Sequence, residues 1–175
     1  NAHLPPDIRA VDIQPVPDSF HARYAAHAKT YHYYLLNARV DDPFLFDTCH
    51  RIWPALDLAA MQAAAAKFVG THDFSALCAS GSSAAAHGDT VRTITDCTVV
   101  QSGNLFTISV TADGYLYNMV RILAGTLVQA GLHKRTPDSI PPLLESRDRK
   151  QAGPTLPAKG LFLERVDYPG LDAIS

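Results

Sequence analysis

The chain has 175 residues, of which 47% are hydrophobic and 18% are charged. This balance excludes an intrinsically disordered or collagen-like protein, and the length suits a globular domain that buries enough apolar surface to fold without disulfides. The formal net charge is −2 at pH 7. A nucleic-acid partner would therefore have to bind to a local patch of basic and aromatic side chains rather than to a generally positive surface.

The three cysteines, Cys49, Cys78 and Cys97, form neither a Cys-x-x-Cys pair nor a zinc-ligand spacing. No apolar run is long enough to cross a bilayer, and no signal peptide is present, so we expect a cytoplasmic protein with reduced thiols. The first residue is Asn1 rather than methionine, which favours a chain that is part of a longer protein. We expect residues 1–175 to form a single domain.

The first half of the chain predicts two strands and one helix. Residues 8–16 carry the apolar side chains of Ile8, Ala10, Val11 and Ile13 and are closed by Pro15 and Pro17, as at the end of a strand. Residues 29–37 alternate in a pattern typical of a strand with aromatic side chains on both faces. Asp57 is a candidate N-cap for a helix whose apolar side chains recur three and four residues apart as far as Phe68, and Gly70 is its expected stop.

The second half predicts a loop, a hairpin and further helices. Residues 78–88 have small side chains that cannot offset the entropy of ordering, so we expect a mobile loop. Residues 93–100 and 105–111 flank a Ser-Gly-Asn turn and predict a hairpin. A helix, a short helical segment and a strand follow, over residues 116–130, from Thr136, and over residues 161–168. The order predicts an α+β fold, with a largely antiparallel mixed sheet and helices on one face.

Arg121 is the charged residue that calls for a partner. Between Asp113 and His133 it is the only charged side chain, in a helix that is otherwise apolar or uncharged. A cation early in a helix gains nothing from the helix dipole, so the expected partner is a carboxylate or a phosphate. The alternative is an arginine whose aliphatic stem packs on the helix while the guanidinium reaches water.

Tyr31 is a second candidate, because basic and titratable residues precede it. Arginine and lysine bind phosphates while an aromatic ring stacks on a base, which contributes about 1–3 kcal/mol per base. This gain is comparable to the cost of removing a nucleotide from its stack. The pattern suits RNA; the alternative is that Tyr31 is an ordinary aromatic residue of a sheet.

A third pattern concerns metal binding. His72 and Asp73 follow a helix stop, and with His50 upstream they resemble the His-Asp pair of metal-dependent phosphohydrolases. No further metal ligands are evident, and an aspartate just after a glycine more commonly belongs to a turn or a cap.

Seven segments of the chain form a more specific pattern than any of them alone. They are residues 4–8, 20–23, 29–33, 70–74, 91–94, 119–121 with Gly125, and 160–163 with 166–168. In this order they resemble the C-terminal part of the TruA family of tRNA pseudouridine synthases. The resemblance covers most of the chain, from Leu4 to Tyr168.

The resemblance implies half of a pseudouridine synthase fold and isomerisation of uridine to pseudouridine in the anticodon arm, at tRNA positions 38–40. It also implies a homodimer that binds tRNA and needs no cofactor or metal. Tyr31 matches the tyrosine that stacks on the flipped uracil and is a candidate base, and Arg121 matches the arginine that pairs with the nucleophilic aspartate. Residues implied in RNA binding are His21, Arg23, Lys29 and Arg92.

One departure from the family pattern concerns the nucleophile. The family aspartate lies in a Gly-Arg-Thr-Asp stretch, and this sequence contains no such stretch. We therefore expect a C-terminal portion that binds RNA weakly and is inactive alone. The resemblance makes His72-Asp73 a structural turn. The alternatives are a non-catalytic RNA-binding or dimerisation module and a metal-dependent phosphohydrolase.

Overall fold

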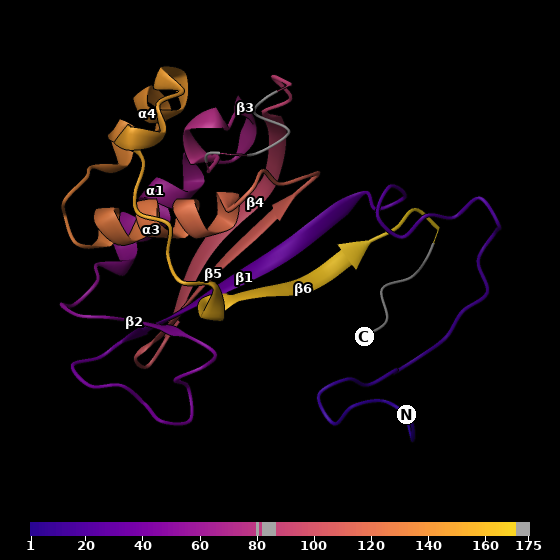
Figure 1. Ribbon diagram of the computed structural model, residues 1–175. Coiled ribbons are helices and arrows are strands. Elements are labelled where there is room, and N and C mark those ends of the chain that lie inside the picture. The colour runs from indigo at the N-terminus through magenta and orange to yellow at the C-terminus, as the bar shows by residue number, and fades with distance from the viewer. Residues whose placement is uncertain (80, 82–86, 171–175) are drawn as a thin grey trace.

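The computed structural model describes residues 1–79, 81 and 87–170. Within these residues the centre of the molecule is a six-stranded sheet (Figure 1). Its strands are β1 (Ala28–Asn37), β2 (His50–Ile52), β3 (Gly70–Asp73), β4 (Val91–Ser102), β5 (Leu105–Ala112) and β6 (Leu161–Asp167). They lie in the order β2-β1-β5-β4-β3, and β6 also pairs with β1. The β1–β2 pair is parallel and the other pairs are antiparallel.

Three α-helices of the described part lie on one face of this sheet (Figure 1). They are α1 (Leu58–Ala66), α3 (Met119–Gly131) and α4 (Ile140–Ser146). Single 3-10 turns complete the connections: η1 (Ser75–Leu77), η2 (Pro137–Ser139), η3 (Arg149–Gln151) and η4 (Ala158–Gly160). The predicted α+β fold, with a largely antiparallel mixed sheet and helices on one face, is confirmed.

β1 is an interior strand with which three other strands pair. β5 pairs along most of one edge, while β6 pairs with the first part of the other edge and β2 with its last part. Tyr33 and Leu35 are fully buried, as expected for alternate residues that face a core. The strand predicted over residues 29–37 is therefore confirmed. In the pairing with β6, the register shifts between Thr30 and Tyr31.

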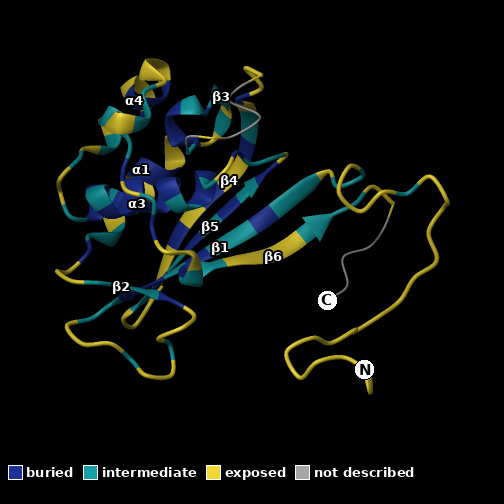
Figure 2. Ribbon diagram, in the orientation of Figure 1, coloured by how far each residue is buried: buried dark blue, intermediate teal, exposed yellow. Residues whose placement is uncertain are grey.

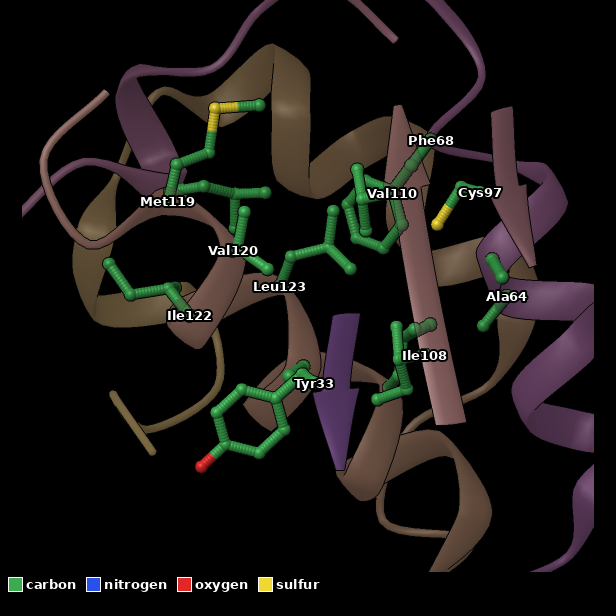
Figure 3. Packing of buried hydrophobic residues seen from close by; sticks show 14 of the residues in the cluster. Tyr33, Ala64, Phe68, Cys97, Ile108, Val110, Met119, Val120, Ile122 and Leu123 are labelled. Carbon is green, nitrogen blue, oxygen red and sulfur yellow. The ribbon is translucent and has the colours of Figure 1, made fainter. Parts of the chain in front are cut away.

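The core lies between the sheet and the helices (Figure 3). Its largest fully buried side chains include Tyr33, Phe68, Phe74, Phe106, Met61 and Leu123. Tyr33 brings a polar group into this cluster, and its hydroxyl lies at the margin of the labelled side chains in Figure 3. It donates a hydrogen bond to the carbonyl oxygen of Pro157 at 2.7 Å. Burial raises the pKa of the Tyr33 phenol above its ordinary value, so the hydroxyl keeps the proton that it donates.

The ends of α1 and α3 follow from local backbone conformation. Oδ1 of Asp57 accepts a hydrogen bond from the amide of Ala60 at 3.0 Å, so the predicted N-cap of α1 is confirmed. The helix ends before the predicted stop at Gly70, which instead begins β3. α3 begins at Met119, later than predicted. Asn118 has φ 61°, and this left-handed conformation cannot be part of a right-handed helix.

The strand predicted over residues 8–16 is wrong. This segment runs away from the body of the molecule, and no described strand pairs with it (Figures 1 and 2). Val11 and Ile13 are 84% and 86% exposed. Apolar residues next to prolines are not sufficient for a strand, because the backbone N–H and C=O groups also need a neighbouring strand.

The remaining elements are confirmed with small shifts. β4 and β5 form the predicted hairpin, with Gly103 at φ 57° in its turn; α4 and β6 lie close to their predicted positions. Of the loop predicted over residues 78–88, residues 80 and 82–86 lie outside the described part. The three cysteines are buried free thiols. In the part of the chain that the structure describes, no helix has the length and apolar character needed to span a membrane.

Candidate active site

A pocket of about 320 Å³ lies where the start of α3 meets β1 and β6. Tyr31 of β1 and Arg121 of α3 both line it, although they are far apart in the sequence. Tyr115, Tyr117 and Asn118, from the segment that leads into α3, complete its polar and aromatic wall. The structure thus brings the two predicted catalytic residues to one cavity. Their roles in a reaction stay predictions.

The guanidinium of Arg121 is half-buried and held at two nitrogen atoms. Nε donates to the carbonyl oxygen of Leu156 at 2.6 Å, and Nη1 donates to Oδ1 of Asn118 at 2.9 Å. No described carboxylate lies within 4.0 Å of it, and Nη2 donates no hydrogen bond to any described residue. The side chain is therefore fixed rather than free in water, while none of the described carboxylates neutralises its charge.

Residues 153–157 form a crossing segment that passes over α3 and supplies the Leu156 carbonyl. The amide of Gly153 donates to Oγ1 of Thr126 at 3.0 Å, and the amide of Leu156 donates to the carbonyl oxygen of Arg121 at 3.3 Å. The approach is close because Gly125 has no side chain: a Cβ there would lie 2.0 Å from the carbonyl oxygen of Pro154. Gly125 thus permits the contact that orients Arg121.

Replacing Gly125 with alanine is expected to lower the free energy of unfolding by about 1–3 kcal/mol, because the new methyl group would overlap backbone that cannot move aside freely. Urea denaturation of the 175-residue chain measures this effect. Gly131→Ala is the comparison in the same helix, since a Cβ there would meet buried side chains, those of Met61 and Leu56, instead of backbone. Equal stability of Gly125→Ala and the parent chain would contradict the close crossing.

Tyr31 lies against Tyr115 in an edge-on arrangement, with ring centroids 4.9 Å apart and ring planes at 83°. The Tyr115 hydroxyl lies 2.8 Å from the carbonyl oxygens of both Lys29 and Val110. Burial, with a smaller contribution from Tyr31, raises the pKa of the Tyr115 phenol well above its ordinary value, so this hydroxyl remains a donor. Tyr115 is therefore a fixed wall, whereas the Tyr31 hydroxyl has no hydrogen-bond partner among the described residues.

The residues predicted to bind RNA occupy two regions. Lys29 lies on β1 close to Tyr31, and its carbonyl is bound by Tyr115. Arg92 lies on β4, where Nη1 pairs with Oδ1 of Asp89 at 2.9 Å and its stem fills the space beside Gly114. Neither lines the pocket itself.

His21 and Arg23 lie in the exposed segment that precedes β1. Nδ1 of His21 accepts hydrogen bonds from the amides of Arg23 and Tyr24, which forms a local turn. The hydroxyl of Tyr168 donates to the carbonyl oxygen of Ala22 at 2.7 Å and ties this turn to the chain that follows β6. The turn is thereby held beside the end of β1 that leads to Tyr31.

The metal-site hypothesis is not supported. His50 lies on β2 and His72 and Asp73 lie on β3, at opposite edges of the sheet. No group of three or more potential ligands suitable for a metal ion occurs within the described residues. Asp73 instead accepts a hydrogen bond from the amide of Ser75 at 3.0 Å and pairs with Nε of Arg147 at 3.0 Å. Its role is structural, although it ends a strand rather than forming only the predicted turn.

Two contributors to the pocket were not predicted from the sequence. Asn118 lies inside the helix that the sequence predicted from residue 116, and Tyr115 would be interpreted as a core aromatic. Only the three-dimensional structure shows that one binds Arg121 and the other packs against Tyr31.

Comparison with known proteins identifies the class of protein to which this chain is similar. Residues 64–169 match the family described as tRNA pseudouridine synthase. Curated relatives named tRNA pseudouridine synthase A include those of Acetivibrio thermocellus and Moorella thermoacetica, both 45% identical over 168 residues. The matches cover 96% of this chain and 68% and 67% of those proteins. The protein from Thermoanaerobacter sp. is 44% identical, with 96% and 68% covered. The chain belongs to the tRNA pseudouridine synthase A family.

Proposed function

We propose that this chain carries the tyrosine and the arginine of a site that isomerises uridine to pseudouridine at tRNA positions 38–40. We further propose that the nucleophilic aspartate comes from polypeptide outside these 175 residues. The observation that carries the proposal is the state of Arg121, which is held at two nitrogens and faces no described carboxylate. A partly buried guanidinium oriented in this way favours an incoming carboxylate partner.

The chemistry assigns a separate task to each residue. The aspartate attacks either the ribose or the uracil ring, and the bond between N1 and C1′ breaks. The base rotates, C5 bonds to C1′ and the bond to the aspartate breaks. C5 loses its proton and N1 gains one, so the product is an isomer of the substrate. Arg121 keeps the carboxylate ionised and directed. The ring of Tyr31 contacts the freed base while it rotates, and its hydroxyl is the candidate acceptor of the C5 proton.

The RNA backbone requires positive charge around this pocket. We propose that Lys29, Arg92, Arg23 and His21 supply part of it. Lys29 lies on β1, which reaches the pocket, and His21 and Arg23 precede that strand. Arg92 lies on β4 and would have to exchange Asp89 for a phosphate. The chain has 15 Lys and Arg residues against 17 Asp and Glu residues, so it carries no overall excess of positive charge. A homodimer in which two subunits jointly bind one tRNA would enlarge the cationic surface. No cofactor is needed for the proposed isomerisation.

The test compares the 175-residue chain with the full-length product of its gene. Each is incubated with tRNA transcripts that carry uridine or cytidine at positions 38–40, with and without a metal chelator. We expect pseudouridine only with the full-length protein, only at these uridines, and irrespective of the chelator. Pseudouridine formed by the 175-residue chain would contradict the external aspartate. A full-length protein that binds tRNA without forming pseudouridine would favour the non-catalytic module, and loss of pseudouridine formation with chelator would show a metal requirement.

A further inference from the structure

Asn118 occupies the N-cap position of α3 but does not cap the helix. An asparagine at this position normally accepts a hydrogen bond from an amide of the first helical turn, and loss of such a bond costs about 1 kcal/mol. Here the side chain makes no capping hydrogen bond. Its Oδ1 accepts from Nη1 of Arg121 instead. The side chain therefore bonds to the proposed catalytic arginine instead of capping the helix.

The backbone of Asn118 also has an uncommon conformation, with φ 61° and ψ 12°. Asparagine and aspartate adopt this left-handed region more readily than other residues with side chains. The conformation ends the preceding segment sharply, and α3 begins at the next residue. It thus places the carboxamide beside a side chain of the first helical turn, that of Arg121.

Two contacts on different nitrogens restrict the plane of a guanidinium more than either contact alone. The Leu156 carbonyl binds Nε, and Asn118 binds Nη1. Both acceptors are neutral, so they orient the group without neutralising its charge. The N–H groups of Nη2 have no described partner and remain for an anion that enters the pocket.

We propose that Asn118 is a positioning residue: it orients the guanidinium of Arg121 and leaves Nη2 available to the carboxylate of the nucleophile. This inference rests on the proposed function, because it requires an incoming carboxylate. It depends on the neutrality of the carboxamide. An aspartate at position 118 has the same shape, but it would form an internal ion pair with Arg121 and compete with the nucleophile.

The decisive variant is Asn118→Asp in the full-length protein. We expect kcat to fall by about 100-fold, in the range found when one stabilising donor of a catalytic site is lost, with KM for tRNA within about twofold. Thermal stability should be unchanged or higher, because aspartate tolerates the left-handed conformation and would pair with Arg121. A purely structural role of Asn118 predicts instead that activity follows stability. Asn118→Asp with the parent kcat would overturn the proposal.

Asn118→Gly separates positioning from charge. Glycine also adopts the left-handed conformation but offers no acceptor to Nη1. We expect a fall in kcat of about tenfold, smaller than that of Asn118→Asp, because Leu156 still binds Nε while no competing charge is introduced. A larger defect in Asn118→Gly than in Asn118→Asp would contradict the role of neutrality.

A second readout does not depend on catalysis. The Nε–Hε signal of Arg121 is followed by NMR in the 175-residue chain while acetate is added as a model carboxylate. We expect an acetate-dependent shift in the parent chain and a much smaller one in Asn118→Asp. Equal responses in both, or no response in the parent chain, would overturn the proposal. If the full-length protein forms no pseudouridine, the proposed function fails. The acetate titration still decides whether Asn118 leaves Arg121 available to a carboxylate.

Discussion

Replacing Arg121 with alanine is expected to lower kcat/KM of the full-length enzyme for tRNA by about 100- to 1,000-fold. This corresponds to about 3–4 kcal/mol of transition-state stabilisation at about 1.4 kcal/mol per tenfold change. The reason is that the incoming carboxylate would lose its charged partner in a partly buried pocket, where an unpaired charge is costly. The measurement is the initial rate of pseudouridine formation at saturating and limiting tRNA concentrations.

Two controls distinguish loss of the partner from loss of the fold. Arg121→Lys keeps a positive charge, but its ammonium group lacks the planar fork that binds Leu156, Asn118 and a carboxylate at the same time. We therefore expect a kcat/KM between those of the parent and the alanine variant. Urea denaturation of each variant reports the structural contribution of the bonds to Leu156 and Asn118. A near-normal rate for Arg121→Ala would refute the pairing with a catalytic carboxylate.

Tyr31→Phe is expected to leave tRNA binding within about twofold of the parent and to reduce kcat by about 100-fold or more, the range of general acid–base catalysis. Stacking survives because the ring is unchanged, whereas the hydroxyl that is the candidate acceptor of the C5 proton is lost. Binding is measured by titration with labelled tRNA and turnover by pseudouridine formation under single-turnover conditions. Unchanged turnover would refute the role in proton transfer.

Tyr115→Phe is the matched control for this variant. Its hydroxyl lies close to Tyr31 but bonds to the carbonyl oxygens of Lys29 and Val110, so it serves the fold. We expect a loss of about 1 kcal/mol in the free energy of unfolding and a smaller effect on kcat than that of Tyr31→Phe. If both variants reduced kcat equally, the effect of Tyr31→Phe would have to be attributed to altered packing of the two rings.

Most of the fold was predictable where the pattern is local. Alternation identified β1, the Ser-Gly-Asn turn identified the hairpin, and Asp57 identified the start of α1. The same reasoning predicted a strand over residues 8–16 that the structure does not contain. A strand exists only if another strand accepts its hydrogen bonds, and no alternation within one segment shows whether such a neighbour is present. β3 was missed because four residues give too short a pattern.

The site was less predictable than the fold, for a related reason. An isolated cation in an apolar helix pointed to Arg121, but composition and spacing alone did not place Tyr31 beside it. They share one pocket because the chain enters α3 next to β1, a long-range arrangement that no local pattern shows. Asn118 was missed because the helix was predicted to begin at residue 116, which placed this residue inside it, whereas α3 begins at Met119 and the Asn118 carboxamide bonds to Arg121.

The structure of the full-length protein tests the central claim most directly, through the surroundings of Nη2 of Arg121. We predict that a carboxylate from outside these 175 residues lies within about 4 Å of this nitrogen, in the pocket shared with Tyr31. A carboxylate of this chain bound there, or a guanidinium that remains without an acidic partner in the complete protein, would contradict it.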